Sequence, residues 1–343
     1  MSAELAALLQ RLDAKDFIGA ELDRLFAIVM DGEAAPEQVK PFLLASIPLM
    51  GDAQALAAGA RAMRARMIAV RAPEGAIDVC GTGGDGAHTL NISTAVAFVA
   101  AGAGVPVAKH GNRAMSSKSG AADVLEALGV KLTAHVSTLE RCLDEAGVAF
   151  LFAQNHHPAM RHVAAARREL GQRTIFNLLG PLANPANVKR QLVGVFAPEF
   201  VRPMAQALHD HLGAEAVCVV HGAGGLDELT PIRGAAHVLP ISLDPGALEP
   251  PPLARDFSDD AASVLAGLRG GDAPANAHAL RALLDGESHD LYRTAVVWNA
   301  AHALAAAGVA DLHLGCEMAE ESIDSGAARE ALDTLIALTK NAP

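Results

Sequence analysis

The chain has 343 residues, 51% of them hydrophobic and 19% charged, which is enough to bury the core of one large domain or two smaller ones. Its formal net charge of −12 argues against a protein whose main partner is nucleic acid, because such binding depends on neutralising backbone phosphates. Aromatic residues make up only 3%, so we expect a core built mainly from Ala, Leu and Val.

The cysteines and the N-terminal segment indicate a reducing compartment. None of the four cysteines belongs to a CxxC pair, and their spacing suits neither a zinc site nor a disulfide framework, so we expect small buried thiols at Cys80, Cys142, Cys218 and Cys316. The first 16 residues carry acids and lack the basic region that opens a signal peptide. The uncharged run 92–108 contains Ser, Thr, Gly and Pro, and is interpreted as a buried helix and strand rather than a membrane span. These features predict a soluble, cytoplasmic protein with no membrane partner.

Residues 1 to about 70 show helical patterns and no clear strand. The first helical stripe, at i, i+3, i+4 and i+7, is formed by Leu5, Leu8, Leu9 and Leu12. A second helix is indicated by Leu25, Ile28 and Val29. The stretch 53–67 is rich in Ala and Arg and is also predicted to be helical.

From residue 77 onward, short apolar strands alternate with helices. Strands are predicted at 77–80, 105–108, 148–153, 191–196, 216–222 and 236–243, and helices at 93–103, 119–129, 158–170 and around 293–308. Asn91 or Ser93 is available to cap the first of these helices, Gly129 closes the second, and Pro158 opens the third. This alternation predicts an α/β fold with a mainly parallel sheet covered by helices on both faces, and 243–252 is predicted to be a Pro-rich loop.

The first polar cluster is the Gly-rich stretch CGTGGDGAHTLNIST, residues 80–94, which follows a predicted strand. Glycines 81–84 lack the Cβ that would keep a phosphate from the backbone N–H groups, and Asn91, Ser93 and Thr94 stand at a helix N-terminus, which favours anions. The loop is neither a dinucleotide GxGxxG nor a GxxxxGK[ST] P-loop, and a purely structural Gly-rich turn stays open as an alternative.

The second cluster, KHGNRAMSSKSG at 109–120, follows the next predicted strand and offers Lys109, Arg113 and Lys118. A basic loop can serve solubility alone, but its position beside the first anion loop favours a second phosphate-binding loop. The third cluster, HGAGGLDELT at 221–230, places Asp227 and Glu228 after a further strand. Mg²⁺ binds few carboxylates and bridges to substrate phosphates, although two solvated loop acids would give the same pattern.

The fourth cluster, 156–187, contains a basic helix with Arg161, Arg167 and Arg168. Arginine suits bidentate binding of a carboxylate, while a solvated helix face is the alternative. The adjacent His156 and His157 cannot easily chelate one metal, and no GxSxG elbow or Cys/His nucleophile pair is present, so a covalent mechanism is not indicated.

Taken in order, these motifs closely resemble those of the anthranilate phosphoribosyltransferases, a family of the tryptophan pathway. The resemblance covers nearly the whole chain and is carried by GTGGD (81–85), NIST (91–94), KHGNRAMSSKSG (109–120), RTIFNLLGPLANP (173–185) and LDE (226–228). It implies transfer of phosphoribose from phosphoribosyl pyrophosphate (PRPP) to the amine of anthranilate, with release of pyrophosphate and with Mg²⁺ as cofactor. No catalytic acid, base or nucleophile is assigned, because an aromatic amine is already unprotonated near pH 7.

The resemblance also implies a nucleoside phosphorylase-like architecture. A small helical domain would comprise residues 1–70 plus about 165–187, and a larger α/β domain would comprise 71–164 and 188–343. Two chains would form a homodimer through their helical domains.

Roles carry over to the motif positions of this chain. The diphosphate and ribose would be held by Lys109, Asn112 and the loop residues Gly81, Thr82, Gly83, Gly84 and Asp85. The phosphate would be held by Asn91, Ser93 and Thr94, and the metal by Ser93, Asp227 and Glu228. Arg167 would meet the anthranilate carboxylate, and His110 and Asn112 would lie close to the acceptor. Further substrate-binding positions within or next to the motifs would be Thr89, Ile92, Gly111, Ser117, Ser119 and Ala121.

Asp85 is the one acid inside the phosphate-binding loop, and we expect it to tune metal and ribose binding, because the ligand arrives with a divalent cation. Two rival readings remain. A pyrimidine nucleoside phosphorylase shares the architecture, but its second Lys-Met-Ser-Gly stretch is not found here. A nucleic-acid-binding relative without transferase activity is disfavoured by the acidic chain.

Overall fold

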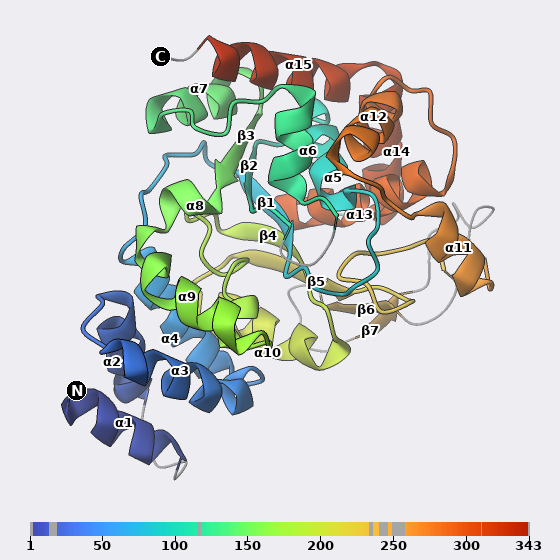
Figure 1. Ribbon diagram of the computed structural model, residues 1–343. Helices are drawn as coiled ribbons and strands as arrows, with labels where there is room; N and C mark the ends of the chain where they lie inside the picture. Colours follow the sequence, from blue (N-terminus) through green and yellow to red (C-terminus); the bar gives the residue numbers. More distant parts are fainter. Residues whose placement is uncertain are drawn as a thin grey trace.

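The computed structural model describes residues 3–13, 19–114, 118–232, 236–239, 246–248, 258–309 and 311–341. The chain begins with the helices α1 (Ala3–Asp13), α2 (Gly19–Met30), α3 (Pro36–Ala45) and α4 (Ala53–Arg64), and a 3₁₀ turn lies at Ile47–Leu49. Helix α4 starts where the Asp52 carboxylate accepts a hydrogen bond from the Ala55 N–H at 2.9 Å. The predicted helical start of the chain is therefore confirmed in the described residues, and these helices form one end of the molecule (Figure 1).

A seven-stranded sheet forms the centre of the rest, in the order β3-β2-β1-β4-β5-β6-β7. Its strands are β1 (Ile77–Gly81), β2 (Val107–Gly111), β3 (Val148–Phe152), β4 (Arg190–Gly194), β5 (Ala216–His221), β6 (Ala236–Leu239) and β7 (Gly246–Leu248). Strands β1 to β5 are parallel, and β6 and β7 are antiparallel. The mainly parallel sheet is thus confirmed.

Two details at the edge of the sheet differ from the sequence expectation. The sequence predicts a loop over 243–252, but residues 246–248 within it form strand β7. These three residues pair with β6 in antiparallel register. The predicted strand 236–243 is present as β6 at Ala236–Leu239, and its remaining residues lie outside the described part of the chain.

Among the described residues, helices connect the five parallel strands, and five further helices follow β7. They are α5 (Ile92–Gly102), α6 (Ala121–Leu128), α7 (Val136–Glu145), α8 (Ala153–His156), α9 (Arg161–Leu170), α10 (Val201–Gln206), α11 (Ala261–Gly267), α12 (Ala273–Leu284), α13 (Leu291–Ala307), α14 (Leu312–Asp324) and α15 (Ala327–Lys340). Short 3₁₀ turns lie at Pro158–Met160, Ile175–Asn177 and Pro198–Phe200, and a π-helical turn lies at Ala207–His211.

The predicted helix boundaries hold with two refinements. Gly129 ends α6 in the left-handed region at φ +98°, as expected of a C-terminal glycine. Pro158 opens a 3₁₀ turn, and α9 itself begins only at Arg161. Asn91 occupies the N-cap position of α5, but its side chain makes no capping hydrogen bond there.

Two hydrophobic cores cover the two faces of the sheet. The first packs α5, α13 and their neighbours against the strands, and the second joins α10 and the N-terminal helices to the side chains of Val193, Val195, Val217 and Val219. The segment after α9 belongs to the second core, where Leu179 lies against Gly59 of α4. Arg64 of α4 also donates to the Leu182 carbonyl at 2.7 Å. The middle of the chain therefore packs with its beginning, while the division into two domains stays a prediction.

No helix within the described ranges is by itself long and apolar enough to span a membrane, and α13 and α14 meet that criterion only together, as a sharply bent pair. All four cysteines are buried and free, as expected.

Candidate active site

The carboxyl ends of β1, β2 and β5 bring three of the four polar clusters into contact. The Asp227 carboxylate accepts a hydrogen bond from the Gly83 N–H at 2.7 Å, and the Glu228 carboxylate accepts one from the Ser93 N–H at 3.1 Å. The Lys109 ammonium lies 3.3 Å from the Ser93 hydroxyl oxygen. The Gly-rich loop, the lysine loop and the acidic pair thus form one site, as ligand sites in open parallel sheets do.

Glycines allow this close approach. A Cβ at Gly81 would lie 2.1 Å from the Asp227 carboxylate, and one at Gly194 would lie 1.5 Å from the Asp227 carbonyl oxygen. A Cβ at Gly222 would lie 1.9 Å from the Glu228 carbonyl oxygen. No side chain fits at these three positions without moving the acidic pair, so their glycines set the geometry of the site.

The Gly-rich loop is anchored to β4. Thr82 donates its N–H to the Gly194 carbonyl at 2.9 Å, and its hydroxyl accepts from the Phe196 N–H at 3.1 Å. Gly83 and Gly84 have positive φ angles of 65° and 80°, which side chains rarely adopt. The loop therefore keeps a turn in which backbone N–H groups can approach an anion.

The acidic pair is a concentration of negative charge. Burial raises the pKa of Asp227, and the charge of Asp85 raises it further. Burial and the charge of Asp227 likewise raise the pKa of Glu228. The Asn299 side chain of α13 holds the residue that follows the acidic pair. It donates to the Leu229 carbonyl at 2.8 Å and accepts from the Leu229 N–H at 3.0 Å.

These residues fit Mg²⁺ bound together with a phosphorylated substrate. Ionised carboxylates that repel one another in a buried place are stabilised by a cation. No group of three or more His, Cys, Asp and Glu side chains suited to a metal occurs among the described residues, so a bound ion would need ligands from the substrate or water. Mg²⁺ favours such sites. A cavity of about 10 Å³, room for one water, lies against Asp227 and Glu228.

Lys109 is held in the gap between β1 and β2. These strands pair in register at Ile77 and Val107, whereas β1 and β4 pair at five positions. Beyond that point side chains bridge the strands: Lys109, 3% exposed, donates to the Val79 carbonyl at 2.6 Å, and the fully buried Asp78 accepts from the His110 N–H at 3.0 Å.

Asp78 and Lys109 are buried close together, and each favours the charged form of the other. Burial lowers the pKa of Lys109, and the Asp78 carboxylate opposes that shift. Asp78 was not among the sequence-predicted site residues; the available signal was an acid inside the apolar strand IDVC.

Histidines line the opposite side of β2. His110 Nδ1 lies 3.0 Å from the Gly180 carbonyl oxygen, and His110 Nε2 lies 3.2 Å from His157 Nε2. Burial lowers the pKa of His110 to about 3 and that of His157 to about 4, so both rings are neutral at pH 7. Asn112, exposed at the end of β2, accepts a hydrogen bond from its neighbour Arg113. The fourth cluster thus meets the second through Gly180 and His157.

The basic loop after β2 is partly tied to α6. Arg113 forms ion pairs of 2.8 Å with Asp123 and with Glu126, so it is not free for an anion. Lys118 is exposed. Ser119 accepts a hydrogen bond from Asn276.

The remaining sequence-predicted site residues lie on several elements around the site. Gly111 ends β2, where a Cβ would meet the Phe150 ring at 2.7 Å, and Ala121 begins α6. Ile92 and Thr94 are buried at the start of α5, and Thr89 lies beside Arg269. Ser117 lies outside the described residues.

Arg167 differs from the other arginines of α9. Arg161 and Arg168 are exposed, whereas Arg167 is half-buried with its guanidinium 5.7 Å from the centre of the Phe176 ring. Burial lowers the pKa of Arg167, and no carboxylate of the described chain pairs with it. Helix α9, which carries it, packs against α2 and α3.

Arg173, also in the fourth cluster, makes the contact with the Gly-rich loop that the sequence did not predict. Its guanidinium donates to the Gly84 carbonyl and stacks on the Phe196 ring at 4.2 Å. The segment that opens RTIFNLLGPLANP is thereby joined to the Gly-rich loop.

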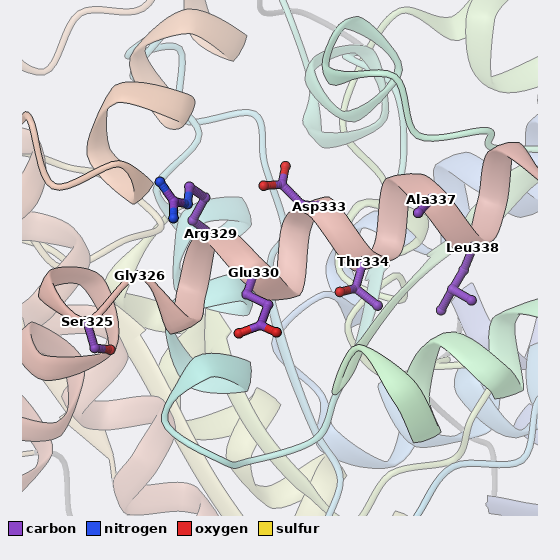
Figure 2. A pocket seen from close by; sticks show the side chains of 8 residues that line it. All are labelled: Ser325, Gly326, Arg329, Glu330, Asp333, Thr334, Ala337 and Leu338. Carbon is purple, nitrogen blue, oxygen red and sulfur yellow. The ribbon is translucent and has the colours of Figure 1, made fainter.

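A surface depression of about 510 Å³ lies elsewhere, along the outer side of α15 (Figure 2). Its lining residues all lie between 325 and 338, and their side chains are mixed in charge. No sequence-predicted site residue takes part in it.

Comparison with known proteins settles the family. The pattern of a family described as "Glycosyl transferase family, a/b domain" matches residues 73–329. The anthranilate phosphoribosyltransferase of Rhizobium rhizogenes is 50% identical over 342 residues, which is 99% of each chain. The chain belongs to the anthranilate phosphoribosyltransferase family. A second such relative, from Rhodospirillum rubrum, is 52% identical over 327 residues, covering 93% of this chain and 91% of its own.

Solved structures of anthranilate phosphoribosyltransferases share the fold. The enzyme of Thermus thermophilus aligns with a TM-score of 0.90 at 40% identity, over 97% of this chain and 99% of that one. The enzyme of Saccharomyces cerevisiae, in complex with PRPP and Mg, aligns with a TM-score of 0.90 at 28% identity, over 99% of both chains. The family resemblance of the motifs is confirmed.

Proposed function

We propose that this chain transfers the phosphoribosyl group of PRPP to the amine of anthranilate and releases pyrophosphate, a step of tryptophan biosynthesis. The observation that carries the proposal is the contact of Asp227 and Glu228 with the Gly-rich loop and the α5 N-terminus, in a chain of this family. The S. cerevisiae relative is known in complex with PRPP and Mg and in complex with 4-fluoroanthranilate, which supports the two substrates.

The site suits a reaction whose leaving group is a polyanion. Asp227 and Glu228, with Ser93, would hold Mg²⁺, which neutralises charge on the departing diphosphate. Lys109 and the N–H groups of the Gly-rich loop would bind the diphosphate and ribose, and the N-terminus of α5 would bind phosphate. The chain would contribute N–H donors and charges close to the departing diphosphate.

The acceptor needs positioning more than activation. Anthranilate carries an aromatic amine that is unprotonated at pH 7, so no general base is assigned. The exposed Asn112 would orient the amine. His110 would lie close to the acceptor, but it is buried and both its ring nitrogens already contact Gly180 and His157. Arg167 would bind the carboxylate of anthranilate, since it is the half-buried arginine of α9 and no carboxylate of the described residues pairs with it.

Replacing Arg167 with lysine is expected to raise the KM for anthranilate about tenfold or more and to leave the KM for PRPP nearly unchanged, because lysine cannot bind a carboxylate with two parallel N–H groups. Steady-state kinetics with each substrate varied in turn measure this. Arg168→Lys is the matched control, since Arg168 is an exposed neighbour on the same helix. Equal anthranilate KM values for the two variants would remove Arg167 from the acceptor site.

The reaction itself is tested by anthranilate fluorescence. We expect the signal to fall only when protein, PRPP and Mg²⁺ are all present, and EDTA to stop the decrease. The same protein should not cleave thymidine or uridine with phosphate and should not bind DNA in a salt-dependent way. Persistent fluorescence from a folded protein with both substrates and Mg²⁺ would reject the transferase.

We also propose that two chains associate through their helical domains, and that the protein is cytoplasmic. The exposed Leu44 of α3, with 45% of its surface accessible, is an apolar position that such an interface could cover. Light scattering that gives the mass of a single chain at micromolar concentration would refute the dimer.

A further inference from the structure

Asn276 of α12 lies between two of the loops that the family motifs assign to substrate. It is 3% exposed, and its side-chain NH₂ donates to Asn91 Oδ1 at 2.9 Å and to Ser119 Oγ at 3.0 Å. Its Oδ1 accepts from the Gly271 N–H at 2.7 Å. One amide thus uses both hydrogens and its oxygen, and it connects segments separated by 157 and 185 positions in the sequence.

The direction of these hydrogen bonds is set by the backbone. The Gly271 N–H can only donate, so it must face the oxygen of the Asn276 amide, and the NH₂ group is then left for the other two partners. Asn91 must therefore present its own oxygen to Asn276. The NH₂ group of Asn91 makes no hydrogen bond with any residue in the described ranges, and it stands at the N-terminus of α5, where an anion is favoured.

The surrounding backbone holds this arrangement in place. The connection from α11 to α12 runs along residues 88–90, with Leu90 donating to the Leu268 carbonyl and Gly270 donating to the His88 carbonyl, each at 2.8 Å. A Cβ at Gly270 would lie 2.6 Å from the Thr89 carbonyl oxygen. The backbone segment that leads into α12 is therefore packed directly against the segment that leads to Asn91.

We propose that Asn276 is a positioning residue that orients the Asn91 amide so that its NH₂ group faces the phosphorylated substrate, and that holds Ser119 beside it. The inference rests on the proposed function for the identity of that substrate. It assigns to α12, which contains none of the family motif residues named above, a part in PRPP binding.

Two substitutions separate orientation from packing. Asn276→Ala removes the donors, and we expect the Kd and KM for PRPP to rise about tenfold, as the loss of hydrogen bonds of ordinary strength predicts. Asn276→Asp keeps the shape and the acceptor for Gly271 but can only accept, so Asn91 would turn its amide and face the substrate with its oxygen. The aspartate variant should therefore bind PRPP more weakly than the alanine variant.

The measurements are calorimetric titration with PRPP and Mg²⁺, and steady-state kinetics. We expect the KM for anthranilate to change by less than about threefold, and the exposed His278→Ala on the same helix to behave as wild type. In a double-mutant cycle, Asn91→Ala and Asn276→Ala should be non-additive in PRPP affinity. If the alanine variant does not fold, the isosteric aspartate variant carries the test.

Unchanged PRPP affinity in both variants would overturn the inference, as would a parallel rise of both KM values with a lowered Tm, which is the result of a general structural role. A wild-type protein that binds PRPP and transfers nothing would refute the proposed function but not the role of Asn276. A wild-type protein that does not bind PRPP would refute both.

Discussion

Replacing Asp227 with asparagine, or Glu228 with glutamine, is expected to lower kcat/KM for PRPP by roughly two to three orders of magnitude. Each change removes a carboxylate that would hold Mg²⁺, and a metal ion contributes several kcal/mol of charge stabilisation in the transition state. Steady-state kinetics at saturating anthranilate, over a range of Mg²⁺ concentrations, measure the loss. Wild-type activity in both variants would show that the acidic pair holds no catalytic metal.

The same substitutions are not expected to lower the stability of the metal-free protein. The pKa values of Asp227 and Glu228 are raised in the folded state by burial and by neighbouring carboxylates, so folding is weakened as pH rises from the ordinary carboxyl range through the raised values. Removing one ionisable group should therefore raise Tm at pH 8 and have less effect near pH 4. Thermal unfolding in EDTA at both pH values tests this, with the exposed Glu74→Gln as control. A large fall of Tm at pH 8 would contradict it.

Replacing Gly194 with alanine is expected to destabilise the protein by about 3 kcal/mol and to abolish most of the activity. The new Cβ would lie 1.5 Å from the Asp227 carbonyl oxygen, which belongs to the backbone and cannot rotate away. Relief requires moving either β4 or the segment that carries the acidic pair, and forced overpacking costs roughly 1–3 kcal/mol, occasionally more.

Urea unfolding measures the stability change, and the fluorescence assay measures the activity. Gly51→Ala is the matched control, because a Cβ at Gly51 meets nothing within 4 Å and its φ is not positive. We expect that control to match wild type. Equal stability and activity of Gly194→Ala and wild type would mean that the acidic pair is not held against β4 as described.

The Gly-rich loop and the polar start of α5 could be located from the sequence because the features that mark them are local. Glycines 81–84 permit a tight turn wherever they occur, and a polar helix start at Ser93 favours an anion without help from distant residues. The alternation of short apolar strands with helices likewise predicted the parallel sheet, since each strand of such a sheet is apolar on both faces. Parallel strands then place their carboxyl ends at one edge, which brought Lys109 and Asp227 into one site.

The contacts that orient these residues were not predictable, because they join positions far apart in the sequence. The residues next to Asn276 in the sequence give no sign that it hydrogen-bonds to Asn91. Those next to Arg173 likewise give no sign that Gly84 is its partner. The short strand β7 was missed for a similar reason, since three residues carry no periodic pattern and pair only because β6 is present.

The sequence by itself determined the kind of protein: a mainly parallel α/β fold, a Gly-rich loop and a lysine-containing loop at strand ends, an acidic pair and the family to which they belong. Only the tertiary structure decided which ionisable side chains are buried and which form ion pairs. It placed Arg113 in ion pairs, gave Arg167 no carboxylate partner among the described residues, and buried Asp78 beside Lys109. The charge state of a side chain depends on its burial and on the charges near it in space. Neither can be read from the residue type or from the adjacent residues in the sequence.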